Sequence, residues 1–90
     1  MNRAKRILEI SKETGALTFG EFRLSAGGTS KYYFDGRLLT LDPEGAYMVA
    51  KVFLEILEAY SVDAIAGPTI GADPIVSAVS VLSYMEGTPI

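Results

Sequence analysis

The residues best suited to chemistry form a loop at positions 67–74, which carries Gly67 and Gly71 and ends at Pro74. Glycine can take backbone angles that are closed to other residues, so successive N–H groups can turn toward one point. A helix that begins near Pro74 would add its own unpaired N–H donors. The loop therefore predicts phosphate binding by backbone donors, and the alternative is a tight strand-to-helix connection that binds nothing.

Several other kinds of site are excluded by what the sequence lacks. The loop is not the nucleotide fingerprint Gly-x-Gly-x-x-Gly, and it is not a P-loop because no Lys-Ser/Thr pair follows it. The chain has no histidine and no cysteine, so a Ser-His-Asp triad, a thiol nucleophile and the common zinc sites are impossible. A net charge of −3 argues against a nucleic-acid binder, which should carry a basic patch.

Length and composition indicate one small globular domain of 90 residues, 49% of them hydrophobic. No secretion signal is expected, because Glu9, Lys12 and Glu13 interrupt the apolar stretch that should follow the basic N-terminus. Residues 64–85 carry a single charge, Asp73, but prolines and glycines break this stretch, so a buried core is favoured over a membrane span. The absence of cysteine fits a reducing compartment, and we expect a cytoplasmic protein.

Three helices are predicted from caps and apolar spacing. Residues 2–14 begin with a capping asparagine, Asn2, and carry apolar side chains on one face. The sequence Asp42-Pro43-Glu44 is a strong helix start, and apolar residues then recur at three- and four-residue spacing. Residues 74–85 have no charge and predict a helix that is covered on most sides, although their valine and serine content leaves a strand open.

The predicted strands are rich in aromatic or β-branched residues and lie between turn signals. Residues 16–24 are expected to form two short extended pieces around Gly20-Glu21, and residues 31–35 a strand, which together make a hairpin-like unit. Residues 62–66 are short and mostly apolar, as expected of a buried parallel strand that follows a helix. Pro89-Ile90 looks like the start of a further strand, so we expect either a fragment or a sheet that another chain completes.

The sequence resembles orotate phosphoribosyltransferase in two motifs. Residues 20–33 follow the pattern Gly-x-Phe-x-Leu-x-x-Gly-x-x-Ser-x-x-Tyr/Phe of that family's N-terminal region, and residues 67–74 follow Gly-Pro-x-x-Gly-x-x-Pro. The resemblance implies an α/β fold with a type I phosphoribosyltransferase-like parallel sheet that is incomplete in this chain. A single domain, 1–90, would hold an N-terminal helix and a β-hairpin hood in residues 1–40 and the start of the α/β core in residues 41–90.

The resemblance also implies an enzyme of de novo pyrimidine (UMP) biosynthesis. Such a transferase moves the phosphoribosyl group from phosphoribosyl pyrophosphate to orotate, with Mg²⁺, and gives orotidine monophosphate and pyrophosphate. The implied partners are these two small-molecule substrates and a second copy of the chain in a homodimer, with no nucleic acid and no membrane.

In the hairpin, the resemblance implies a site for the base. A flat pyrimidine would stack on Tyr33 or Phe34, and only one of them should face it because neighbours in a strand point to opposite sides. The family pattern favours Phe34, and the alternative is that one of the two aromatics fills the core. Ser25 would contact the ligand through its hydroxyl or serve as a turn residue, and Lys31 would approach an anionic ligand or stay solvated.

In the pyrophosphate loop, the resemblance implies that backbone amides donate hydrogen bonds to the diphosphate. The amides are those around Thr69, Ile70, Gly71 and Ala72. Some relatives carry a lysine at the position of Gly71, so binding here would rest on backbone donors and magnesium. The family's paired acids and basic catalytic loop are absent from the 90 residues, so we expect no catalytic residue and no metal ligand in this chain, which alone would be inactive.

Two other functions stay open. A regulatory protein on the same scaffold would keep a phosphoribosyl pyrophosphate site to sense this ligand without catalysis, whereas the enzyme needs both the acidic motif and the basic loop. An interaction fragment would instead bury the uncharged residues 74–85 against a partner.

Overall fold

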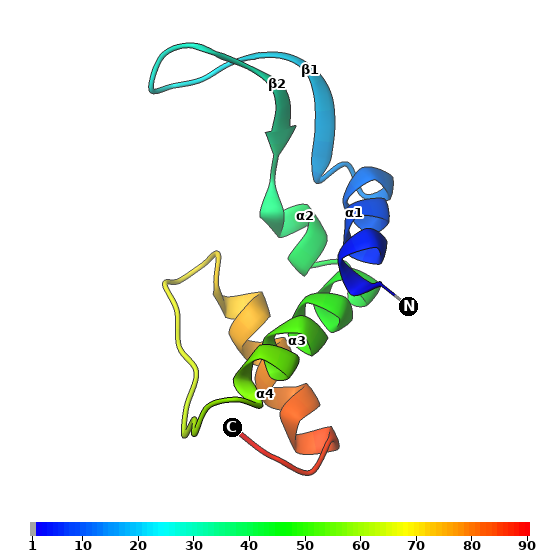
Figure 1. Cartoon of the computed structure of the whole chain (residues 1–90). Coiled ribbons are helices and arrows are strands. Elements are labelled where there is room, and N and C mark those ends of the chain that lie inside the picture. The colour runs from blue at the N-terminus through cyan, green and yellow to red at the C-terminus, as the bar shows by residue number, and fades with distance from the viewer. Residues whose placement is uncertain (1) are drawn as a thin grey trace.

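The computed structural model describes residues 2–90, which form a body of helices with a hairpin that projects from it (Figure 1). One helix precedes the hairpin, and the others follow it. In chain order the elements are α1 (Arg3–Glu13), β1 (Leu17–Arg23), β2 (Thr29–Phe34), α2 (Gly36–Thr40), α3 (Pro43–Leu57) and α4 (Asp73–Met85).

Two of the predicted helices begin at the expected side-chain caps. In α1 the side-chain oxygen of Asn2 accepts from the Lys5 amide at 3.2 Å, and in α3 the Asp42 carboxylate accepts from the Gly45 amide at 2.8 Å. The third, α4, has Pro74 in its first turn and no side-chain cap. The strand alternative for this uncharged segment is wrong, because it forms a helix of 13 residues.

The hairpin is built from β1 and β2, which pair antiparallel. Leu17 pairs with Phe34 at its base, and Arg23 pairs with Thr29 near its tip. The register shifts at Gly20-Glu21, where the sequence predicted a turn between two pieces, but β1 continues as one strand of seven residues. The predicted hairpin is therefore confirmed, with an irregularity in place of the turn.

The core consists of two apolar clusters, and α3 contributes to both. The first cluster, which joins α1, α2 and α3, contains Ile10, Ala16, Leu39 and Met48. The second cluster, which joins α3 and α4, contains Ala50, Leu54, Val79 and Leu82. The sequence did not predict α2, a helix of five residues that places Leu39 in the first cluster.

The parallel strand expected at residues 62–66 is not formed. Within residues 2–90 the sheet has two strands, β1 and β2, and the chain between α3 and α4 is irregular (Figure 1). A strand requires hydrogen bonds to a neighbouring strand, and the described chain offers this segment no such neighbour. The expected burial is not found either, because Asp63, Ala64 and Ala66 are exposed and only Val62 and Ile65 are partly buried.

Pro89-Ile90 does not begin a strand either. Instead, Ile90 is tied to α4, because the Ser80 hydroxyl donates to its carbonyl at 3.1 Å and its amide donates to the Ser83 hydroxyl at 3.0 Å. Part of the polar stripe on α4 therefore binds the backbone of the following segment. None of the helices in the described residues is long and apolar enough to span a bilayer.

Ion pairs connect the helices across the surface of the body. Arg6 in α1 binds both carboxylate oxygens of Glu44 in α3, with Nε 2.7 Å from Oε2, and its Nη1 lies 3.2 Å from Glu13. Arg3 and Glu55 make a second α1–α3 pair at 2.6 Å. The hydrogen bonds from Arg6 hold the pKa of Glu44 below its ordinary value of 4.5.

Val79→Ala should lower the free energy of unfolding by about 2 kcal/mol, because it removes apolar groups from a side chain with no exposed surface. Val81 lies on the same helix but is 59% exposed, so Val81→Ala should change the free energy by less than about 0.5 kcal/mol. Urea unfolding followed by circular dichroism measures both values. Equal effects would contradict the assigned buried face of α4.

Glu44→Gln should lower the midpoint of thermal unfolding at pH 7, because it removes the charge that Arg6 binds. Since the pKa of Glu44 is lowered on folding, its carboxylate stabilises the fold at pH values above 4.5. This contribution to stability is lost as the pH falls through the pKa of Glu44 in the folded protein. The difference in unfolding midpoint between wild type and variant should therefore disappear at acidic pH.

Glu21→Gln is the control for this change, because Glu21 makes no ion pair within residues 2–90. It should leave the midpoint unchanged at pH 7. A difference between wild type and Glu44→Gln that persists at pH 3 would count against a stabilising carboxylate.

Candidate functional site

Tyr33 and Phe34 lie next to each other on β2, near the base of the hairpin, and both are about half exposed, at 53% and 49%. The ring of Tyr33 lies 5.8 Å from that of Phe22, tilted by 41°. The ring of Phe34 lies so close to Gly36 that a Cβ there would come within 3.3 Å of it. The alternative that one of the two aromatics fills the core is therefore wrong, because each keeps exposed ring surface.

Ser25 and Lys31 lie away from the helical body and are both exposed. Ser25 occupies the turn at the hairpin tip, where the Gly27 amide donates to the Leu24 carbonyl at 3.0 Å and the Leu24 amide donates to the Gly28 carbonyl at 3.1 Å. Gly27 and Gly28 have φ values of +98° and +82°, which a residue with a side chain rarely adopts. Ser25 therefore lies in a turn with its side chain exposed, a position compatible with either of its two expected roles.

The base of the hairpin is held by Asp35. Its amide donates to the Ala16 carbonyl at 2.7 Å, and its carboxylate accepts from both the backbone and the side chain of Arg37, at 3.1 and 3.2 Å. The hydrogen bonds from Arg37 lower the pKa of Asp35. Arg37 is thus paired with Asp35 at the start of α2.

The loop before α4 offers unpaired backbone donors. The amides of Thr69, Ile70 and Gly71 donate to no acceptor in residues 2–90, whereas the Ala72 amide donates to the Pro68 carbonyl at 3.0 Å. The peptide bond between Thr69 and Ile70 is cis. Three of the four amides expected to donate to a diphosphate are therefore available, and the fourth, that of Ala72, already donates to the Pro68 carbonyl.

The acid at the start of α4 takes part in the same loop. The Thr69 hydroxyl donates to the Asp73 carboxylate at 3.3 Å, and the Asp73 amide donates to the Ile70 carbonyl at 3.1 Å. These contacts close the loop onto the helix. Within the described residues, no group of three or more acidic side chains lies close enough together to hold a metal ion.

Gly67 has a different role from the one its residue type suggested. Neither Gly67 nor Gly71 is among the glycines with positive φ, so the loop does not depend on backbone angles closed to other residues. A Cβ on Gly67 would lie 2.5 Å from the Cβ of Ala72. Glycine is therefore needed here because the segment before the loop passes directly against the start of α4.

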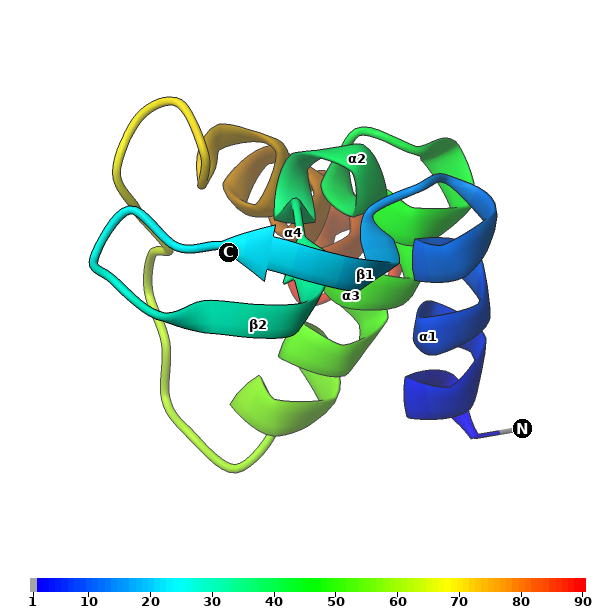
Figure 2. The ribbon, with the colours of Figure 1, turned by 90° about the horizontal axis from the view of Figure 1, so that it is seen from above.

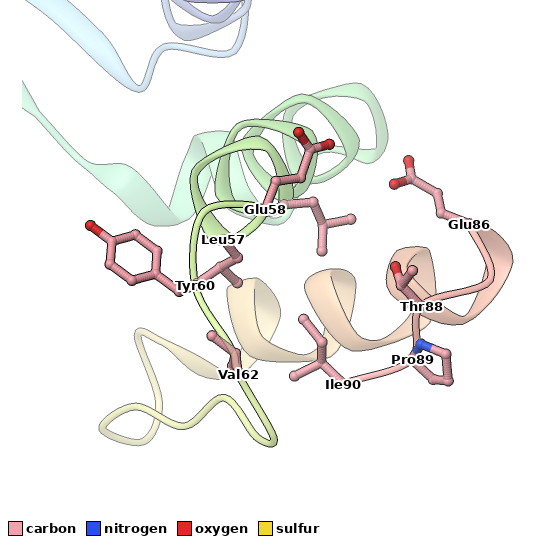
Figure 3. Close-up of a pocket in the computed structure, with 9 residues that line it drawn as sticks. Leu57, Glu58, Tyr60, Val62, Glu86, Thr88, Pro89 and Ile90 are labelled. Carbon is pink, nitrogen blue, oxygen red and sulfur yellow. The ribbon is translucent and has the colours of Figure 1, made fainter.

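The hairpin tip and the loop before α4 extend to the same side of the helical body, as Figures 1 and 2 show from two directions. A cleft in the described residues lies elsewhere, beside the C-terminal end of α3, and has a volume of about 550 Å³ (Figure 3). Its lining residues are Leu54, Leu57, Glu58, Tyr60, Val62, Glu86, Thr88, Pro89 and Ile90. No predicted site residue lines it, and sequence reasoning missed it because it forms only when residues 86–90 fold back.

Gly67→Ala should lower the free energy of unfolding by about 1–3 kcal/mol, because its Cβ cannot fit against Ala72 without displacing the loop. Gly71→Ala is the matched control, since a Cβ there meets nothing within 4 Å, and it should leave stability nearly unchanged. Urea unfolding compares the two variants. If both were equally harmless, the close approach between Gly67 and Ala72 would be contradicted.

The chain is similar in sequence to curated proteins named orotate phosphoribosyltransferase. The protein from Aquifex aeolicus (strain VF5) is 40% identical over 86 residues, which are 96% of this chain and 44% of that protein. The protein from Thermosynechococcus vestitus is 52% identical over 68 residues, 76% of this chain and 35% of that protein. This chain therefore spans less than half the length of these relatives. No protein-family profile matches it.

Solved structures share the fold of the chain. A UMP synthase from Leishmania donovani matches 92% of this chain and 19% of its own, with a TM-score of 0.76 and 30% identity. The orotate phosphoribosyltransferase of Mycobacterium tuberculosis, solved with Fe(III) dicitrate, matches 88% of this chain and 46% of its own, with a TM-score of 0.76 and 24% identity. The predicted fold class and the resemblance seen in the sequence are thus confirmed: this chain is homologous, over most of its length, to part of the orotate phosphoribosyltransferases.

Proposed function

We propose that this chain contributes the hood and the pyrophosphate loop to an orotate phosphoribosyltransferase. The enzyme would transfer the phosphoribosyl group from phosphoribosyl pyrophosphate to orotate and give orotidine monophosphate and pyrophosphate, a step of pyrimidine biosynthesis. The observation that carries the proposal is the set of unpaired amides at Thr69, Ile70 and Gly71, directly before α4, in a chain homologous to these enzymes. Residues 1–40 would form the hood, and residues 41–90 the start of the catalytic core.

The loop suits a diphosphate because it supplies donors where negative charge would lie. Unpaired amides at the N-terminal end of α4 bind anionic oxygens directly, and the helix dipole adds a favourable field. Gly71 brings no positive charge to the loop, so affinity would depend on these amides. The exposed carboxylate of Asp73 is bound by the Thr69 hydroxyl at 3.3 Å, so one hydrogen bond satisfies part of this charge beside the loop.

Magnesium is proposed for the whole enzyme, although the residues of this chain do not fit a magnesium site of their own. Mg²⁺ prefers an octahedron of oxygen ligands that includes one or two carboxylates and substrate phosphates. The described residues contain no close group of three acids, and the loop presents N–H donors instead of oxygens. The ligands of the Mg²⁺ ion would therefore be groups other than the side chains of this chain.

The hairpin would cover the base. Tyr33 and Phe34 are both exposed and belong to neighbouring positions of β2, so their rings face opposite sides of the strand. We assign the stacking role to Phe34, whose ring lies beside Gly36, while the Tyr33 ring packs against Phe22. In the exposed part of the hairpin, the Ser25 hydroxyl and the Lys31 ammonium group would contact polar and anionic parts of the ligand.

A cytoplasmic homodimer is the proposed form of the enzyme. Its support is the exposed apolar surface at the C-terminal end of α4, where Val81, Tyr84 and Met85 are 59%, 76% and 74% exposed. Apolar side chains gathered on one face are typical of a surface that a partner covers. The chain by itself would not turn over orotate, since the acidic motif and the basic loop lie outside its sequence.

A titration of the ¹⁵N-labelled chain with pyrophosphate should shift the amide signals of Thr69, Ile70 and Gly71 more than that of Ala72, whose amide is already bonded. The measurement is a series of ¹⁵N–¹H correlation spectra with and without Mg²⁺. Shifts spread evenly over the lysines and arginines would indicate only non-specific attraction and would overturn the assignment of the loop.

An orotate-consumption assay with phosphoribosyl pyrophosphate and Mg²⁺ should show no turnover by the chain alone.

Phe34→Leu should weaken orotate binding about threefold to tenfold, because an aromatic stacking contact contributes about 0.5–1.5 kcal/mol beyond burial. Isothermal titration calorimetry measures the affinity. Tyr47→Leu, on the exposed surface of α3, is the control and should leave affinity unchanged. A larger loss in Tyr33→Leu than in Phe34→Leu would contradict the choice of Phe34.

A further inference from the structure

Asp35, the residue after Phe34, joins the hairpin to the helical body. It keeps the extended backbone of β2, with φ −111° and ψ 99°, and α2 begins at the next residue. Its amide donates to the Ala16 carbonyl at 2.7 Å, one position beyond the pair of Leu17 with Phe34 that ends the ladder. The backbone that carries Phe34 is therefore tied to β1 up to the point where α2 begins.

The carboxylate of Asp35 fixes the start of α2. One of its oxygens accepts from the Arg37 amide at 3.1 Å, which caps the helix, and also from the Arg37 Nε at 3.2 Å. The Arg37 side chain is 69% exposed, and an ion pair in such a position contributes little to stability. The cap is the more important contact, because α2 has only five residues and a helix this short does not persist by itself.

The ring of Phe34 lies against the first residue of this capped helix. A Cβ on Gly36 would come within 3.3 Å of the ring, so the ring and the α2 backbone are in close contact. At its other end α2 is held by the core, where Leu39 packs with Ile10 and Met48. A change in how α2 begins would therefore move the surface on which the Phe34 ring rests.

We propose that Asp35 is a positioning residue for orotate, whose cap on α2 holds the Phe34 ring in the orientation that stacks on the base. This role rests on the proposed function, since it takes orotate as the ligand and Phe34 as the stacking ring. Asp35 acts through that ring and does not contact the base. Removal of its cap should therefore cost no more affinity than removal of the ring.

Two substitutions separate the cap from the ion pair. Asp35→Glu keeps the negative charge beside Arg37 but removes a good helix cap, whereas Asp35→Asn keeps the cap and removes the charge. We expect Asp35→Glu to weaken orotate binding about threefold, within the contribution of an aromatic stacking contact. Asp35→Asn should bind orotate as tightly as the wild type. Isothermal titration calorimetry measures both affinities, and the reverse order would overturn the role of the cap.

Asp42→Ala is the matched control for Asp35→Ala, because each variant removes one helix cap. The Asp42 carboxylate accepts from the Gly45 amide at 2.8 Å at the start of α3, away from the hairpin. Both variants should lower the midpoint of thermal unfolding, but only Asp35→Ala should weaken orotate binding when the affinity is measured well below that midpoint. Equal losses of affinity would show that binding simply follows stability, and they would overturn the proposal.

A double-mutant cycle tests whether Asp35 acts through the ring. In the Phe34→Leu background, Asp35→Glu should cause no further loss of orotate affinity, because the group that it positions is already absent. Additive losses would show that Asp35 affects the ligand by another route, and they too would overturn the proposal.

The position of the ring can also be measured without ligand. A nuclear Overhauser effect between the Phe34 ring protons and the Gly36 α-protons should appear in the wild type and in Asp35→Asn, and it should weaken in Asp35→Glu. An unchanged effect in Asp35→Glu would overturn the positioning role, whatever the affinity. If the wild type bound no orotate while this contact depended on the cap, the proposed function would be contradicted and the positioning of the ring would stand.

Discussion

The packing of α3 against helices on both of its sides is the interaction on which the rest of the structure depends. On one side Met48 meets the cluster from α1 and α2, and on the other Ala50 and Leu54 meet α4. The approach of α2 is so close that a Cβ on Gly45 would collide with the Leu39 carbonyl oxygen. Without this double packing, the short helices on either side would bury too little apolar surface to persist.

Ion pairs follow the same connections but are secondary to the packing. Arg6 links α1 to Glu44 in α3, and Lys51 in α3 pairs with Glu86, just after α4. All of these side chains keep contact with solvent, where an ion pair contributes little to stability. Their effect is to favour one arrangement of the three helices that the apolar clusters already bring together.

The helical body positions the candidate site through two short attachments. The hairpin joins it where the Asp35 amide binds the Ala16 carbonyl, and the loop joins it where Gly67 passes against Ala72. Both candidate binding elements therefore lie outside the apolar core, on the same side of a packed scaffold (Figure 2). Residues on such elements can change in sequence without loss of the core that orients them.

By itself the sequence determined the elements whose signals are local. The caps at Asn2 and Asp42, the turn glycines and the aromatic strand each act within a few residues, so the helices and hairpin could be predicted. The tertiary structure alone decided that residues 62–66 pair with no strand and that the Ala72 amide donates to the Pro68 carbonyl. It also decided that a cleft forms where the segment after α4 folds back. These features depend on groups distant in sequence, because a strand needs a partner and an amide is free only if no acceptor folds against it.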